Sequence, residues 1–146
     1  MERIKADAQE IQFATFEVTG LRFGVELCCV QELIRYQEMT AVPLATPAVS
    51  GLINLRGQIV IAVDARRALS LPERDRAEQP MNVVLRSEDG CTSLLVDRIG
   101  DVVSVDKSAS VPPPENIPLS LRQKIRHVFQ MPDALLLIPD LVQVLG

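Results

Sequence analysis

The segment from Gly51 to Asp64 constrains the fold of this chain more than any other part of the sequence. It reads as a turn around Arg56, a run of aliphatic residues and an aspartate. The run from Gln58 to Val63 is β-branched and short, which is typical of a buried strand. Asp64 can accept hydrogen bonds from the first N–H groups of a helix, so we expect a short helix through Leu69.

The same pattern recurs near the C-terminus. A shift of 76 residues lays Gly51–Leu69 over His127–Leu145, aligning the aliphatic strands and pairing Asp64 with Asp140. A shift of 69 residues lays Phe23–Ile34 over Thr92–Val103 and matches five aliphatic positions. We interpret the matches as an internal duplication. The alternative is chance similarity, since any two β hairpins share alternating aliphatic residues.

The remaining patterns also favour strands. Alternation over Phe13–Val18 and Phe23–Leu27, around a turn at Thr19-Gly20, predicts a hairpin. Over Cys28–Tyr36 the pattern fits a strand or one helical turn, and we favour the strand. Further strands are expected at Met81–Leu85, Thr92–Val105 and Leu135–Ile138, with short helices at Leu119–Arg126 and Leu141–Leu145. Two similar units of about five strands would stack through their apolar sides and leave a groove for a partner.

Charged and proline-rich stretches suggest the domain organisation. Residues 1–11 lack a hydrophobic period and are predicted to be a flexible arm. Leu71–Pro80 is charged and carries two prolines, so it is the expected linker between lobe one, roughly 12–75, and lobe two, roughly 80–146. Ser108–Pro118 contains four prolines and is expected to be a semi-rigid loop. Residues 12–146 together make one domain.

Charge and composition exclude several classes of protein. The net charge is −4, with lysine and arginine scattered along the chain, which argues against nucleic-acid binding. No run approaches the roughly 18 apolar residues of a membrane span, and Met1–Glu10 is too charged for a secretory signal. We therefore expect a cytoplasmic protein without membrane insertion.

The sequence offers little for catalysis. Cys28 and Cys29 are adjacent and Cys91 is isolated, so neither a disulfide framework nor a C-x-x-C motif is available. We interpret the three thiols as small buried hydrophobic groups. His127 is the only histidine and has no neighbours at metal-ligand spacing. We expect no enzyme activity, cofactor or metal; a catalytic or small-molecule-binding module would require polar groups that converge in a cavity.

Several motifs together resemble a known family. These are FGVEL from Phe23, VQEL from Val30, GLINLRG from Gly51, VDAR from Val63 and LVD from Leu95. They are similar to the CheW family of chemotaxis coupling proteins, over about Phe13 to Leu145. The resemblance implies a mainly β fold of two intertwined SH3-like five-stranded β barrels with a few short helices, and no catalysis.

The resemblance also implies partners and a location. Proteins of this family join the regulatory domain of a CheA-type histidine kinase to the cytoplasmic tip of methyl-accepting chemoreceptors. The expected protein is therefore a non-catalytic adaptor, monomeric alone, and recruited to receptor arrays at the inner membrane. The alternative is a scaffold of a related chemosensory pathway, for pilus motility or non-motility signalling.

Contact residues carried over from the family lie in three places. They are Val30 and Glu32 after the first hairpin, Gly51, Arg56 and Ile59 in the central segment, and Ile99 with Val102 in the second lobe. Asn54 and Gly57 join them, because these two residues and Arg56 are not repeated in the second copy.

The carried-over residues include aliphatic and charged side chains, which have different roles. A groove lined by Val30, Ile59, Ile99 and Val102 would accept the apolar face of a receptor helix. Arg56 and Glu32 would fix the register through charge. The alternatives are that the aliphatic residues are ordinary core, and that Arg56 is an internal clamp on a carboxylate or a carbonyl.

Overall fold

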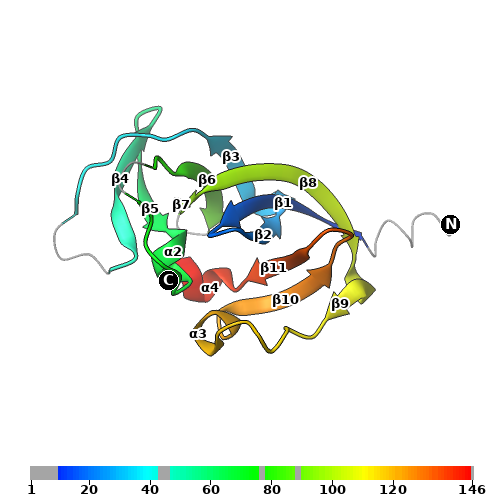
Figure 1. The fold of residues 1–146 in the computed structure, drawn as a ribbon. Helices are drawn as coiled ribbons and strands as arrows, with labels where there is room; N and C mark the ends of the chain where they lie inside the picture. The colour runs from blue at the N-terminus through cyan, green and yellow to red at the C-terminus, as the bar shows by residue number, and fades with distance from the viewer. Residues whose placement is uncertain (1–9, 43–46, 76–77, 88–89, 146) are drawn as a thin grey trace, which may run out of the picture.

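The computed structural model describes residues 10–42, 47–75, 78–87 and 90–145, and most of them lie in β-strands (Figure 1). The strands are β1 (Glu10–Val18), β2 (Leu21–Glu26), β3 (Val30–Ile34), β4 (Val49–Leu55), β5 (Gln58–Asp64), β6 (Met81–Ser87), β7 (Gly90–Val96), β8 (Arg98–Asp106), β9 (Ser110–Val111), β10 (Ile125–Gln130) and β11 (Leu135–Pro139). The short helices are α2 (Ala65–Ala68), α3 (Leu119–Arg122) and α4 (Leu141–Leu145), with 3-10 turns η1 (Leu27–Cys29) and η2 (Lys107–Ala109).

These strands form two sheets. One has six strands in the order β8-β1-β2-β11-β10-β9, and the other has five in the order β3-β6-β7-β5-β4. The predicted fold class, mainly β with two barrel-like units and a few short helices, is confirmed. The two-residue strand β9 adds a sixth strand to one of the sheets.

The strand pairing confirms the duplication. Hairpin β1–β2 of the first copy joins β8, β10 and β11 of the second, while hairpin β6–β7 of the second joins β3, β4 and β5 of the first. Even the register repeats, since Phe23 lies beside Leu137 and, at the equivalent positions, Thr92 lies beside Ile61. The two copies have therefore exchanged hairpins, which is the intertwining that the family resemblance implied.

The repeated aspartates also perform the same role in both copies. Asp64 Oδ1 accepts a hydrogen bond of 2.9 Å from the Arg66 N–H at the start of α2. Asp140 Oδ1 accepts one of 3.1 Å from the Val142 N–H in α4. The predicted helix caps are confirmed, and they fix the direction in which the chain leaves each aliphatic strand.

The boundary between the predicted lobes does not separate the sheets. Leu71–Pro80 connects α2 to β6, and both β5 and β6 belong to the five-stranded sheet. The segments 12–75 and 80–146 each contribute strands to both sheets. Residues 1–9 of the predicted arm lie outside the described residues, and Glu10 and Ile11 already belong to β1.

Four local predictions were wrong in part. The strand expected over Cys28–Tyr36 begins with the turn η1 and is confined to β3. Thr92–Val105 is two strands, which break at Asp97. The loop Ser108–Pro118 contains β9, and the helix expected over Leu119–Arg126 ends early, where β10 begins.

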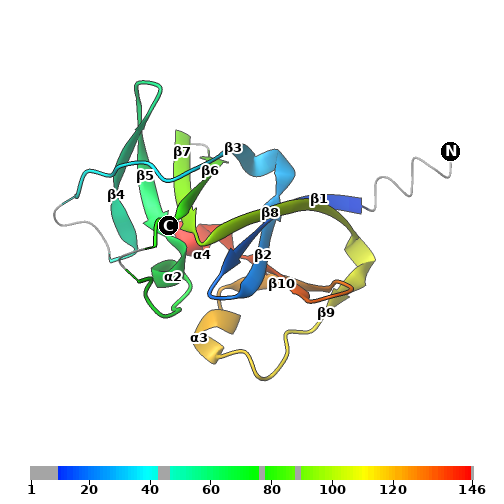
Figure 2. The same cartoon turned by 45° about the horizontal axis from the view of Figure 1, so that its top comes forward.

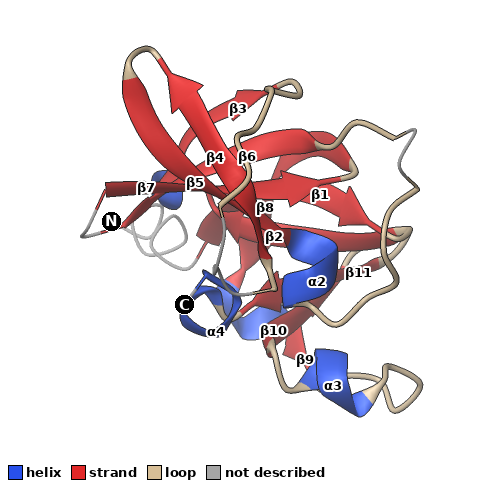
Figure 3. Cartoon of the chain, turned by 90° about the vertical axis from the view of Figure 1, so that its left-hand side faces the viewer, coloured by secondary structure: helices blue, strands red, loops and turns tan. Residues whose placement is uncertain are grey.

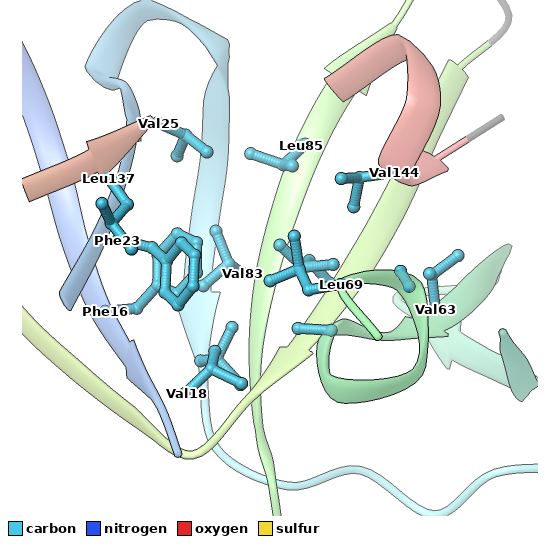
Figure 4. Packing of buried hydrophobic residues seen from close by; sticks show 14 of the residues in the cluster. Phe16, Val18, Phe23, Val25, Val63, Leu69, Val83, Leu85, Leu137 and Val144 are labelled. Carbon is cyan, nitrogen blue, oxygen red and sulfur yellow. The ribbon is translucent and has the colours of Figure 1, made fainter. Parts of the chain in front are cut away.

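The hydrophobic core has a shared centre and two smaller parts. The shared cluster lies between the two sheets and includes Phe16, Phe23, Val83, Leu85 and Leu137 (Figure 4). A second cluster is made only by the six-stranded sheet and a third only by the five-stranded sheet. In the second cluster, the ring centroids of Phe13 on β1 and Phe129 on β10 lie 5.7 Å apart although β2 and β11 separate these strands in the sheet order, so the sheet curls around the cluster.

Candidate protein-binding surface

The hairpin β4–β5 projects from the body of the molecule and turns at Arg56 and Gly57 (Figures 2 and 3). Both turn residues have positive φ, 52° and 86°, as a two-residue type I′ turn requires. Asn54 Oδ1 accepts a hydrogen bond of 2.9 Å from the Gly57 N–H. Asn54 and Gly57 therefore shape the turn, which places Arg56 at its tip.

Arg56 makes a two-pronged ion pair with Glu32. Its Nη1 lies 2.6 Å from Oε2 and its Nη2 lies 2.9 Å from Oε1. Glu32 is on β3 and Arg56 follows β4, the two edge strands of the five-stranded sheet, so the pair bridges the gap between its edges. The Arg56 side chain remains 79% exposed, against 16% for Glu32. Arg56 thus clamps a carboxylate and also faces solvent.

Gly51 has a backbone role. A Cβ atom at Gly51 would lie 2.6 Å from the carbonyl oxygen of Thr40. Thr40 and Leu52 exchange two backbone hydrogen bonds, of 2.9 and 2.8 Å, which hold the β3–β4 connection against β4. Gly51 is buried, so the structure explains it by this close approach of two chain segments.

The face of β5 that packs into the shared core at Val63 continues as an apolar surface beyond the point where that core ends. Ile61 and Ile59 alternate with buried residues and lie on the same face as Val63, which belongs to the shared cluster. Their exposed fractions are 47% and 61%. Ile61 was predicted as an interior residue of a buried strand, and that prediction was wrong.

The second copy buries the equivalent face. Leu137 corresponds to Ile61 and is 2% exposed, and Val128 on the paired strand is 1% exposed. Ile117 and Leu121, from the longer connection that precedes β10, belong to the same cluster as these two residues. The first copy therefore exposes an aliphatic surface that its own duplicate covers. We call Ile59, Ile61 and the neighbouring Leu52 the β5 surface.

The four residues of the predicted groove fall into two settings. Val30 and Ile99 are half-buried and pack against the shared cluster. Ile59 and Val102, 61% and 46% exposed, lie on β5 and β8 and so belong to different sheets. Leu33 occupies the position equivalent to Val102 and is 39% exposed. Sequence reasoning missed Leu33 and Ile61, because alternation does not show which end of a strand extends beyond the core.

Asp97 is the most extensively bonded carboxylate of the described chain. It accepts hydrogen bonds from Arg66 (2.6 and 3.1 Å), from Arg74 (2.9 Å) and from the Thr19 N–H (2.8 Å). Burial acts to raise the pKa of Asp97, but these bonds outweigh it and hold the pKa below its ordinary value. Such a carboxylate stays ionised and paired, which suits a structural anchor rather than a general acid or base.

The cysteines are less buried than predicted. Cys28 is exposed, and Cys29 and Cys91 are of intermediate exposure. Over the residues that the structure describes, Glu26, Cys28 and Cys29 are the one group whose potential metal-ligand atoms all lie within 4.8 Å of one another. Within the part of the chain that the structure describes, no helix is long and apolar enough to span a membrane.

Comparison with known proteins identifies the family. The family model described as the CheW-like domain matches residues 12–146. The chain belongs to the CheW-like domain family. A CheW-like relative, "Chemotaxis protein CheW" of Bacillus subtilis (strain 168), is 28% identical over 130 residues, which cover 89% of this chain and 83% of the relative. The protein of the same name from Treponema pallidum (strain Nichols) is 24% identical over 137 residues, covering 91% and 81%.

A solved structure shares the fold. The crystal structure of the scaffolding protein TtCheW from Thermoanaerobacter tengcongensis superposes with a TM-score of 0.78. The alignment covers 89% of this chain and 88% of that one at 19% sequence identity. The CheW-like fold thus survives extensive change of sequence, so conclusions about binding must come from the exposed residues of this chain.

Proposed function

We propose that this CheW-like protein is a non-catalytic adaptor that couples chemoreceptors to a CheA-type histidine kinase in chemotaxis signalling. Its relatives from Bacillus subtilis and Treponema pallidum are chemotaxis proteins, and its structural neighbour is a scaffolding protein. The observation that carries the proposal is the exposed β5 surface, because Leu137 and Val128, the counterparts of Ile61 and Leu52 in the second copy, are buried.

The β5 surface has the properties of a modest protein-binding site. Burying an isoleucine side chain contributes about 1.5–3 kcal/mol. Ile59 and Ile61 are already partly covered, so together they would contribute about 2–3 kcal/mol before the cost of ordering the partner. Arg56 adds a charged group at the adjoining tip, and its exposed guanidinium can meet a partner carboxylate. Such a site favours a reversible contact within a larger assembly.

An adaptor needs a second surface, and exposed aliphatic residues on the edge strands support placing it there. Val102 on β8 and Leu33 on β3 are exposed aliphatic residues at the edges of the two sheets. We propose that β8 contacts the cytoplasmic tip of a methyl-accepting receptor and that the β5 surface contacts the regulatory domain of the kinase. The protein would then act in the cytoplasm, at receptor arrays.

A matched pair of substitutions tests the β5 surface. Ile59 and Leu119 are both 61% exposed, so Ile59→Asp and Leu119→Asp make the same chemical change at equal exposure. We expect Ile59→Asp to weaken binding of the cognate kinase regulatory domain about tenfold or more, with an unchanged melting temperature. Leu119→Asp should bind like wild type in the same calorimetric titration. Equal loss in both variants, or no binding by wild type, would contradict the proposal.

Two further substitutions separate the partners. Val102→Asp should reduce binding of a receptor-tip fragment and leave kinase binding intact, as measured by pull-down with each partner alone. Arg56→Asp places a carboxylate beside Glu32 and should reduce binding more than thermal stability. Equal losses of both in Arg56→Asp would show that Arg56 is an internal clamp and not a contact residue.

A further inference from the structure

Two thiols and a carboxylate converge at the turn between β2 and β3. Glu26 ends β2, and Cys28 and Cys29 lie in the 3-10 turn η1 that follows. Cys28 Sγ lies 3.5 Å from Glu26 Oε2, and the ligand atoms of the three residues all lie within 4.8 Å of one another. We propose that Glu26, Cys28 and Cys29 bind a thiophilic metal ion, with Zn²⁺ as the ion best suited to them.

The geometry needs little change to hold the ion. Zn–S bonds of about 2.3 Å at the tetrahedral angle place two thiolates about 3.8 Å apart. Rotation of the cysteine side chains can bring the two sulfurs from within 4.8 Å to that separation. A carboxylate oxygen supplies a third ligand and leaves one coordination position open. Two soft sulfur ligands favour Zn²⁺ over Mg²⁺ or Ca²⁺, which prefer oxygen.

The site is accessible from two sides. Glu26 and Cys29 line a cavity of about 540 Å³ that also includes His127. Glu26 and Cys28 line a neighbouring cavity of about 460 Å³. Lys107 lines both cavities, and among the described residues Glu26 has no ion pair within 4.0 Å. The carboxylate is therefore available to a cation that arrives through either cavity.

The duplication shows that the fold does not require these three residues. The equivalent positions in the second copy hold Leu95, Asp97 and Arg98. Leu95 is buried in the cluster of the five-stranded sheet, and Asp97 is tied to Arg66 and Arg74. One copy thus uses this turn as an ion-paired anchor, while the other places two thiols and a carboxylate there. The site is independent of the β5 surface and of the proposed adaptor function.

Zinc titration of the reduced full chain, with a chromophoric competitor, tests the site. We expect one Zn²⁺ per monomer. Cys28→Ser and Cys29→Ser should each weaken binding about tenfold or more, and Glu26→Gln should weaken it less. Cys91→Ser is the matched control, because it removes a thiol outside the cluster and should leave affinity unchanged. Mg²⁺ should not compete.

Alkylation of the wild-type chain provides a measurement that needs no variant. Zn²⁺ should slow iodoacetamide labelling of Cys28 and Cys29, mapped by mass spectrometry, and leave labelling of Cys91 unchanged. Three results would overturn the proposal: no saturable Zn²⁺ binding by wild type, equal loss of affinity in Cys91→Ser, or one ion shared by two chains with dimer formation. Thermal melts of the serine variants confirm that each is folded.

Discussion

The hairpins β4–β5 and β10–β11 occupy equivalent places in the two copies but differ in charge at their tips. In the first copy the tip carries Arg56, which pairs with Glu32 on an edge strand. In the second copy the tip carries Asp133, whose carboxylate oxygens lie 3.0 and 3.2 Å from the guanidinium of Arg22 on β2. Each tip is tied down by an arginine and a carboxylate, with the signs reversed. The fold therefore accepts either sign at the tip.

The faces of the two hairpins differ in a more consequential way. Their strands pair in the same register, yet Ile61 is 47% exposed and its counterpart Leu137 is 2% exposed. Ile117 and Leu121 join the buried cluster that includes Leu137. A covered face stabilises the fold, whereas an uncovered one is available to a partner. The duplication thus provides an internal control for nearly every substitution on the β5 surface.

The largest effect on stability is expected when the same substitution is made at equivalent positions of the two hairpins. Leu137→Asp places a charge in the shared core and should lower the free energy of unfolding by about 3 kcal/mol or more, enough to unfold much of the protein. Ile61→Asp, at the equivalent position, should change it by less than about 1 kcal/mol. Urea denaturation monitored by circular dichroism measures both. Similar losses would show that Ile61 belongs to the core.

A smaller but still large effect is expected at Asp97, which occupies the position equivalent to Cys28. Asp97→Asn removes the charge that pairs with Arg66 and Arg74, whose side chains are only 12% and 8% exposed. We expect a loss of about 2–3 kcal/mol at neutral pH. Cys28→Ser at the exposed counterpart should leave stability near that of wild type.

The pH dependence of stability tests the same carboxylate. Because the pKa of Asp97 in the folded protein lies below its ordinary value, its stabilisation is complete above about pH 4 and is lost as the pH falls through the folded pKa. Wild type should therefore lose more stability than Asp97→Asn on acidification through this range. Parallel pH curves from chemical denaturation would contradict the assignment.

Local patterns predicted much of the fold. Alternation identified the strands, and the aspartate after each aliphatic run identified both helix caps, because these features depend on neighbours in sequence. The intertwining of the two units was predicted by the family resemblance and not by local patterns. Strand β9 was missed because a two-residue strand among prolines has no period, and the break at Asp97 was missed because aliphatic residues continue on both sides of it.

The candidate site was less predictable, because exposure depends on what covers a strand. The family resemblance singled out Ile59 as a contact candidate, and its contact role stays a prediction. The strand pattern placed Ile61 in the interior, yet both side chains are exposed. The cysteines were assumed to be buried since their side chains are small and apolar, and only the three-dimensional turn shows that Cys28 lies beside Glu26. The contact roles of Val30, Ile99 and Val102 remain predictions that binding measurements must test.

A moderate difference in stability is expected between alanine substitutions at Gly51 and at Gly57. Gly51→Ala forces a Cβ to within 2.6 Å of the Thr40 carbonyl oxygen, so the β3–β4 connection must move and stability should fall by about 1–3 kcal/mol. Gly57→Ala meets no atom within 4 Å and carries only the cost of positive φ, about 1 kcal/mol. Thermal unfolding compares the two. The second copy has His127 at the position of Gly51, so this close approach belongs to the first copy alone.

The smallest effect is expected at the charged tip of the β4–β5 hairpin. Arg56→Ala removes an exposed ion pair and should lower the free energy of unfolding by less than about 1 kcal/mol. A double-mutant cycle with Glu32→Ala should give a coupling energy of that size, and the coupling should shrink as salt is added. If the cycle instead gives a large coupling that is insensitive to salt, the pair closes the sheet edges as a structural element. A small coupling together with weakened kinase binding in Arg56→Ala would mean that the first tip has retained its arginine for a partner.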